Sequence, residues 1–266
     1  MSYSRDEIVS FMNDYLEVDS VQDVCPNGLQ VQGNERISKI VTAVSANLEV
    51  FEYAKKVAAE LVLVHHGLLW NDEHLTVTGN LAERLGFLLE NKINLVAYHL
   101  PLDMHTVVGN NILTVKKLGL TKIKPFGEYH GQKIGFQGEL KEISLSDLQK
   151  KLEKLFGTKA ELISGNKKKV KKIAVVSGGG MFALDEAARE VDVLIRGEIH
   201  EPTPAFCRET GLAYIGLGHY KSETLGVQEL GKLLKSKFKG LQVEFFAEEN
   251  PYGKTVLKFR LRRISK

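Results

Sequence analysis

The sequence contains only two cysteines, Cys25 and Cys207, among 266 residues. They form no C-x-x-C pair, which excludes a zinc knuckle and a thioredoxin-like redox motif. With only two cysteines in the chain, a disulfide framework is also excluded as the main stabiliser. Two unused thiols are typical of a reducing compartment, so we predict a cytoplasmic protein. A chain of this length buries a full core without cross-links and has room for one or two domains.

Long apolar stretches and an excess of one charge are also lacking. The longest runs free of Asp, Glu, Lys and Arg are Met104–Val115 and Ile173–Leu184, with twelve residues each. A membrane-spanning helix needs about 20, and the first residues do not form a secretory signal. Lys and Arg number 36 against 33 Asp and Glu, which leaves a net charge of +3. This balance predicts neither a membrane nor a nucleic acid as partner.

One short segment is nevertheless strongly basic. Five of the six residues from Lys167 to Lys172 are lysines. We interpret the segment as a solvated loop, because sites for single-stranded nucleic acid interleave aromatic residues with basic ones and none occurs here.

Strands and helices are predicted to alternate along most of the chain. The aliphatic run Leu61–Val64 suits a strand that is buried on both faces of a parallel sheet. Apolar residues recur at helical spacing over residues 47–59 and 79–91, between such strands. This rhythm predicts an α/β fold of three-layer units with largely parallel sheets. The predicted strands are Lys39–Val44, Leu61–Val64, Asn94–Tyr98, 172–176, Asp192–Ile195 and Ala213–Leu217.

The two halves of the chain repeat each other. Lys39–Ser45 parallels Lys172–Ser177, and the third strand of each half is followed by His-x-x-x-carboxylate, at His99 to Asp103 and at His219 to Glu223. The repeat predicts two α/β units of similar topology, with generic βαβ patterning as the alternative.

We place the first unit at residues 1–125 and 240–266, and the second at residues 126–239. The second unit contains an inserted strand-helix-strand segment. The final strand, Thr255–Ile264, alternates apolar and basic residues in the manner of a half-exposed edge strand.

Side chains of the kind that bind divalent metals follow the predicted strands. Ligands gather outside the carboxyl ends of strands in open α/β sheets. Imidazole and carboxylate bind first-row divalent metals, which leaves iron, manganese, zinc, nickel and cobalt open. The adjacent histidines diverge, so each reaches a different ion. The sequence therefore predicts two ions about 3.5–4 Å apart, held by His65, His66, Asp103, His219 and Glu223.

Other residues near these ligands have less specific patterns. His99 could be a sixth ligand, but it slightly precedes Asp103, and we favour for it a role in orienting Asp103 or a bound water. His105 is a weaker candidate of the same kind. Trp70, the only tryptophan, lines the pocket or belongs to the core. The remaining histidines, His74, His130 and His200, are interpreted as surface or structural residues.

A glycine-rich turn, Ser177–Ala183, matches G-x-G-x-x-A, and Glu198 lies 20 residues after Gly178. This spacing is a nominal dinucleotide fingerprint. The matching turn of the first half, Ser45–Asn47, has no glycine, and Glu198 occupies the position that histidines occupy there. We therefore favour a tight turn whose amides cradle an anion such as a substrate phosphate.

Five motifs together resemble the GTP cyclohydrolase I type 2 homologues, also called the NGG-interacting-factor-three-like family. The resemblance covers nearly the whole chain, and its motifs are Asn27–Gly33, His65–Gly67, Tyr98–Asp103, the triple glycine and Gly218–Glu223. It implies two intertwined α/β domains and a toroidal homohexamer with metal sites facing an inner cavity. It also implies that the five ligands are those named above, with Glu223 touching both metals. Glu198 and His200 match a further pattern near the cavity.

Three functions follow from these observations. The first is a metal-dependent hydrolase of a nucleotide or related heterocycle, because the family name implies hydrolytic opening of the guanine ring of GTP. A metal-bound water would then be the reactive group, with His99 and Glu198 as candidate catalytic partners. The second is a non-catalytic protein that binds or delivers metal. The third is a dinucleotide-binding oxidoreductase, which rests on the glycine turn alone.

Overall fold

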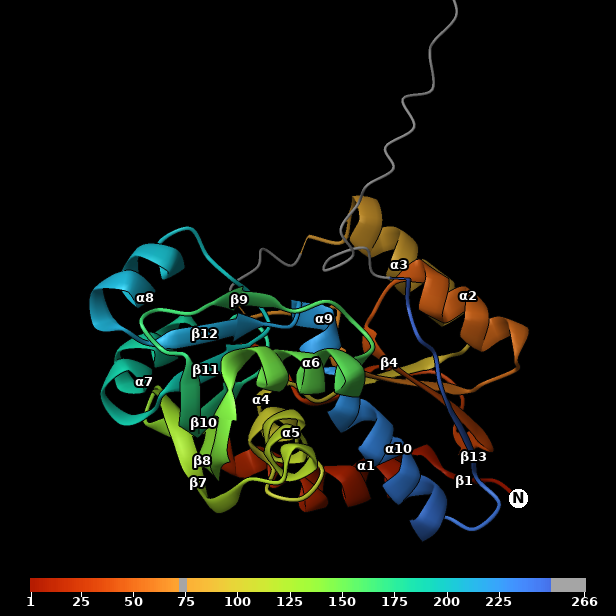
Figure 1. Ribbon diagram of the computed structural model, residues 1–266. Helices are drawn as coiled ribbons and strands as arrows, with labels where there is room; N and C mark the ends of the chain where they lie inside the picture. The colour runs from red at the N-terminus through yellow and green to blue at the C-terminus, as the bar shows by residue number, and fades with distance from the viewer. Residues whose placement is uncertain (72–75, 250–266) are drawn as a thin grey trace, which may run out of the picture.

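Figure 1 shows a computed structural model of the chain, which describes residues 1–71 and 76–249. The described elements form two main sheets, one on each side of the view, with helices on both faces of each. The predicted edge strand Thr255–Ile264 lies outside the described residues.

The first sheet has a parallel centre. Its middle strands are continuous aliphatic runs, and every residue of Leu61–Val64 is buried, as expected for strands that are covered on both faces. Only the last strand in the order runs antiparallel to its neighbour. The order is β13 (Gln242–Phe245), β4 (Lys39–Ser45), β5 (Leu61–His66), β6 (Asn94–Ala97) and β2 (Gly28–Val31).

The second sheet also has parallel central strands, extended by antiparallel strands on both sides. Its order is β7 (Thr121–Tyr129), β8 (Gln132–Ser144), β10 (Lys169–Val176), β11 (Val193–Arg196), β12 (Ala213–Gly216) and β9 (Glu161–Ile163). A separate pair joins β1 (Tyr3–Ser4) to β3 (Arg36–Ile37).

Helices cover both faces of the first sheet. One face packs against α1 (Arg5–Tyr15) and α10 (Thr224–Lys237), and the other packs against α2 (Leu48–Lys56) and α3 (Gly79–Glu90). Figure 1 shows α2 and α3 together on one side and α1 and α10 on the opposite side. The unit therefore has three layers.

The second sheet has the same three layers, and the two units exchange a helix. One face packs against α5 (Asn110–Leu118) and α6 (Leu145–Phe156), and the other packs against α7 (Leu184–Glu190) and α8 (Thr203–Thr210). Helix α5 follows β6 of the first sheet but packs on the second, while α10 follows β12 and packs on the first. The prediction of intertwined, largely parallel α/β units is confirmed.

One local prediction needs correction, and one strand is missing from the predictions. The basic segment is not a loop throughout, because β10 begins at Lys169 and pairs with β8. Its lysines lie beside acidic side chains, with Lys169 Nζ 3.0 Å from Glu142 and Lys171 Nζ 3.3 Å from Glu139. Strand β7 is not predicted by the sequence, and it crosses residue 125 to join the second sheet.

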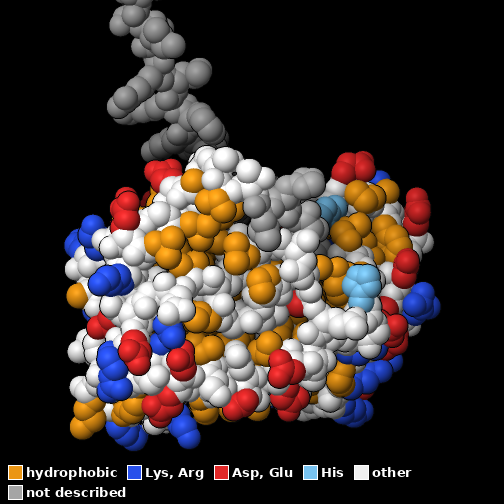
Figure 2. All heavy atoms as spheres, turned by 180° about the vertical axis from the view of Figure 1, so that it is seen from behind, with side chains coloured by type: hydrophobic (Ala, Val, Ile, Leu, Met, Phe, Trp, Pro, Cys, Tyr) orange, Lys and Arg blue, Asp and Glu red, His pale blue; other side chains and the backbone are white. Residues whose placement is uncertain are grey.

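The surface carries charges of both signs. Figure 2 shows hydrophobic side chains at the centre of one face, with acidic and basic side chains mixed around its edge. No helix within residues 1–71 and 76–249 is long and apolar enough to cross a membrane.

Candidate metal centre

The five predicted ligands meet where the carboxyl ends of the parallel strands of both sheets approach each other. His65 and His66 are the last residues of β5. Asp103 lies in α4 (Leu100–Met104), directly after β6. His219 begins α9 (His219–Ser222) after β12, and Glu223 lies between α9 and α10. The structure therefore brings all five side chains together.

Three of these side chains form a buried group. His65 Nε2 lies 3.4 Å from Asp103 Oδ2 and 3.6 Å from Glu223 Oε1. All three residues are buried, and their ligand atoms lie within 4.8 Å of one another. This spacing leaves room for one ion between them.

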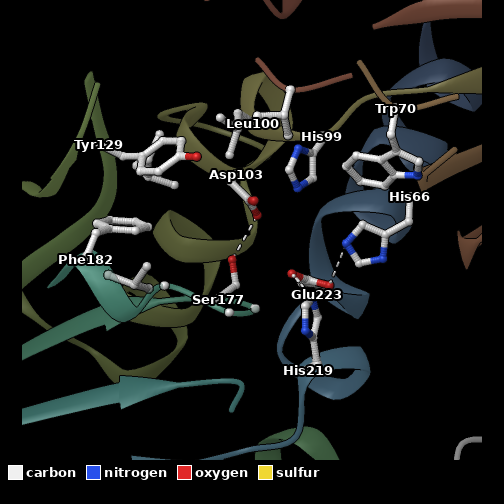
Figure 3. A pocket seen from close by; sticks show the side chains of 16 residues that line it. His66, Trp70, His99, Leu100, Asp103, Tyr129, Ser177, Phe182, His219 and Glu223 are labelled. Atoms are coloured by element: carbon white, nitrogen blue, oxygen red, sulfur yellow. Dashed lines mark hydrogen bonds and ion pairs between the residues drawn. The ribbon is translucent and has the colours of Figure 1, made fainter. Parts of the chain in front are cut away.

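Glu223 also belongs to a second group, which faces a pocket. Its Oε2 lies 3.3 Å from His66 Nε2, and its Oε1 lies 3.2 Å from His219 Nε2. His66 and His219 are partly exposed. Figure 3 shows the Glu223 carboxylate between these two imidazole rings. The adjacent histidines therefore reach different groups, and the carboxylate of Glu223 is shared by both.

The donor set fits divalent metal ions. Among the residues that the structure describes, His65 Nε2 and Glu223 Oε2 are buried and make no hydrogen bond. A buried polar atom without a partner costs about 1–3 kcal/mol, and a bound cation would satisfy both atoms. Imidazole nitrogen and carboxylate oxygen are ligands that iron, manganese, zinc, nickel and cobalt accept.

Neighbouring groups orient the imidazole rings of His65 and His219. His65 Nδ1 lies 2.8 Å from the carbonyl oxygen of Tyr98, to which it donates a hydrogen bond. His219 Nδ1 lies 2.7 Å from Glu198 Oε1, and Glu198 Oε2 lies 3.1 Å from His200 Nε2. Such contacts at Nδ1 direct Nε2 toward an ion, as is common around metal-binding histidines.

The role predicted for His99 toward Asp103 needs correction. Asp103 Oδ1 instead accepts hydrogen bonds from Asn110 Nδ2 at 2.9 Å and Ser177 Oγ at 2.8 Å. His99 Nδ1 lies 2.9 Å from Asp23 Oδ1, so Asp23 fixes the His99 ring. A ring nitrogen of His99 still lies within 4.8 Å of ligand atoms of His65 and His66.

The other histidines lie outside the cluster or outside the described residues. His105 Nε2 lies 3.0 Å from the carbonyl oxygen of Tyr15, and its Nδ1 accepts from the amide of Val107. His105 is therefore a structural residue and no ligand candidate. His130 is exposed after β7, and His74 lies outside the described residues.

The glycine turn packs against the ligand cluster. A Cβ on Gly178 would lie 2.3 Å from Glu223 Oε1 and 3.1 Å from His219 Nε2. Glu198, the acidic residue of the nominal dinucleotide fingerprint, instead contacts His219 and His200. The carboxylate that a dinucleotide would need is therefore already used by two histidines. The close packing of the turn against Glu223 accounts for the glycine at position 178.

Charges in the cluster are strongly coupled. Burial lowers the pKa of His66 to about 3, so this imidazole is neutral. Burial opposes protonation of His65 as well, but the carboxylates of Asp103 and Glu223 hold its pKa well above the usual value. Although burial opposes it, Glu223 and Glu198 raise the pKa of His219 to about 9. A metal ion would replace the protons on His65 and His219.

The pocket beside the cluster has a volume of about 580 Å³, within the range typical of small-molecule sites. His66, His99, Asp103, His219 and Glu223 line it together with the glycine turn. Trp70 also lines it and lies edge-on to His99, with ring centroids 5.2 Å apart. Trp70 is therefore a pocket residue, the first of the two roles considered for it.

Sequence patterns do not identify the residues that hold these ligands in place. Asp23 lies in an irregular segment 76 residues before its partner His99. Asn110 and Asn111 begin α5 as fully buried polar residues, and Asn111 Oδ1 accepts from the amide of Ser177. The pair Asn110–Asn111, at the start of a helix whose next residues are apolar, is the signal that would have drawn attention to them.

Comparisons with known proteins place this geometry in context. The model of a family described as Duf34/NIF3 (NGG1p interacting factor 3) matches residues 3–251. A relative from Pyrococcus horikoshii, named GTP cyclohydrolase 1 type 2 homolog, is 44% identical over 94% of this chain and 99% of its own. One of the same name from Neisseria meningitidis is 39% identical, over 93% of this chain and 98% of its own.

Solved structures share the fold over the same length. Protein ybgI, described as of unknown function, superposes with a TM-score of 0.88 at 34% identity, covering 94% of this chain and 100% of its own. Reduced HcgD from Methanocaldococcus jannaschii has a TM-score of 0.83 at 25% identity, covering 93% and 99%.

Proposed function

The chain belongs to the Duf34/NIF3 (NGG1p interacting factor 3) family, and on that premise we propose that it binds two divalent metal ions and acts as a metal-dependent hydrolase. The substrate class is a nucleotide or related heterocycle, in keeping with the name of its relatives, GTP cyclohydrolase 1 type 2 homolog. The observation that carries the proposal is the shared carboxylate of Glu223 between a buried and a pocket-facing ligand group.

The two groups suit different tasks. His65, Asp103 and Glu223 are buried, so an ion there would be shielded from solvent. His66 and His219 line the pocket, so an ion there would face a substrate. Paired divalent ions lower the pKa of bound water and polarise the centre that the water attacks.

Residues around the pocket would supply the remaining functions. Asp23 fixes His99 through its Nδ1, which leaves Nε2 as the ring atom available to hold or move a proton at the pocket. Asn110 and Ser177 hold the Asp103 carboxylate in position. Glu198 does the same for the imidazole of His219.

Turnover by the metal-loaded protein tests this function. The protein is incubated with GTP and a panel of nucleotides, and products are separated by chromatography. We expect turnover that Glu223→Gln abolishes together with metal binding. His99→Asn should keep both metals but lower turnover roughly 10²–10⁴-fold. Absence of any product from protein with two bound metals would refute the hydrolase proposal.

A second candidate function is metal delivery without catalysis. The partial exposure of His66 and His219 favours it, because a partly exposed ion can pass to an acceptor. Transfer of metal from the loaded protein to a metal-free acceptor, with no nucleotide turnover, would support delivery over hydrolysis. The predicted homohexamer is tested separately by sedimentation.

A further inference from the structure

An aromatic wall faces the ligand cluster across the pocket. Tyr129, at the end of β7, packs against Phe182 in a tilted arrangement, with a centroid distance of 5.0 Å and an interplanar angle of 39°. Figure 3 shows both rings on one side of the cavity, with His66 and Glu223 on the other. Phe182 is 36% exposed. Aromatic faces at a pocket wall are suited to a planar ligand.

The position of Phe182 is built into the fold. Gly127 in β7 has φ +75°, and a Cβ there would lie 3.4 Å from Phe182 Cε2 and 3.2 Å from Val176 Cγ2. The left-handed φ of Gly127 favours glycine, and Phe182 packs against this residue, beside Tyr129. Val176 and Ile134 add aliphatic surface to the same pocket, so an apolar ring would be well covered.

Within the described residues, the pocket presents no permanently charged cation to a polyanion. Within residues 1–71 and 76–249, no lysine or arginine lines it, and its acidic side chains are Asp103 and Glu223. Phosphate recognition normally uses arginine, lysine or free backbone amides.

The first amide of the glycine turn is not available to a phosphate. The amide of Gly178 already donates to Ser222 Oγ, and the carboxylate of Glu223 lies against the same residue. Arg196 lies beneath the turn, but it is fully buried and its guanidinium carbon is 5.8 Å from the centroid of the Tyr214 ring. Its charge is therefore not presented at the pocket surface.

We propose that this pocket takes a planar, uncharged aromatic ring, which stacks on Tyr129 and Phe182, and that the chain itself recognises no phosphate group there. This proposal rests on the proposed function, which assigns the side of the pocket with the metal ligands as the reactive side. It deepens that function by separating recognition of a heterocycle from recognition of its phosphates.

Trp70 provides the assay, because the only tryptophan of the chain lines the pocket. Quenching of its fluorescence is measured on metal-free full-length protein with guanosine, GTP and inorganic triphosphate. We expect saturable quenching by guanosine, a similar affinity for GTP within about threefold, and no saturable quenching by triphosphate. Tyr129→Ala and Phe182→Ala should each weaken guanosine binding roughly tenfold, while Tyr129→Phe retains it.

Leu89→Ala is the matched control, since Leu89 is an exposed apolar residue on α3 that does not line the pocket. It should bind guanosine as the unchanged protein does. Circular dichroism establishes that each variant is folded, and metal stoichiometry is measured for each. Normal metal content with no guanosine binding overturns this proposal alone, whereas guanosine binding without any metal binding overturns only the proposed function.

Two further results would overturn the inference. One is GTP binding more than tenfold tighter than guanosine in the absence of metal, which would mean that the chain recognises phosphate and would implicate Arg196. The other is unchanged guanosine binding in both alanine variants.

Discussion

Replacing Gly178 by alanine should remove both metals while leaving the fold intact. The residue has φ +63°, where alanine costs about 1–2 kcal/mol. The new Cβ would lie 2.3 Å from Glu223 Oε1, so the carboxylate must move by about 1 Å to reach ordinary contact distance. Metal-ligand distances tolerate only about 0.2 Å. Both ligand groups share Glu223, so metal affinity should fall at both. The loss should be at least roughly 10–100-fold, as is typical when a residue that supports a metal ligand is disturbed.

Gly157→Ala separates backbone strain from the clash. Gly157 ends α6 with φ +60°, and a Cβ there meets nothing within 4 Å. Urea denaturation should show a loss of about 1–2 kcal/mol in metal-free Gly157→Ala and at least as much in metal-free Gly178→Ala, where the displacement of Glu223 adds to the strain. Calorimetric titration with Mn²⁺ or Zn²⁺ should show lost affinity only in Gly178→Ala. Metal affinity and stoichiometry equal to those of the unchanged protein in Gly178→Ala would refute the reasoning.

Three further predictions concern other parts of the account. Glu198→Gln should weaken metal binding roughly 10–100-fold at the His66–His219 group alone, because it removes the carboxylate that holds His219; equal weakening of both groups in a two-site titration would contradict this. Metal binding should tighten as pH rises toward about 9, because the ion displaces the proton of His219; calorimetry in buffers of different ionisation enthalpy should detect proton release, and none would argue against the assignment. Burial opposes ionisation of Asp192, but the amides of Lys172 and Lys171 and the ammonium of Lys167 hold its pKa below the usual value. Its charge therefore stabilises the fold above the usual carboxyl pKa, and this contribution is lost as pH falls through the lowered value. Asp192→Asn should cost about 1 kcal/mol of unfolding free energy at neutral pH, and a difference that persists in acid would count against this explanation.

The sequence predicts much of the fold because central parallel strands are buried on both faces and must be aliphatic throughout. Leu61–Val64 is such a run, and the polar pair His65–His66 marks the end of its strand at the sheet edge. Ligand residues could therefore be proposed from strand ends alone. This pattern does not predict strand β7, because Pro125, Gly127 and two lysines interrupt its alternation of apolar and polar residues.

Tertiary contacts decide the rest of the site. Asp23 bonds to His99, which lies 76 residues later in the chain. Asn110 bonds both to Asp103 and to the amide of Gly226, which lies 116 residues after Asn110. Neither contact follows from spacing along the chain. The exchange of α5 and α10 between the sheets creates the second of these contacts, since it places the start of each helix beside the other unit.

The central claim is that one carboxylate is shared by two metal ions. Anomalous diffraction from crystals grown with Mn²⁺ or Zn²⁺ tests it most directly. The account predicts two peaks about 3.5–4 Å apart, one beside His65 and Asp103, one between His66 and His219, and both next to the carboxylate of Glu223. A single peak, or peaks that do not contact Glu223, would contradict it.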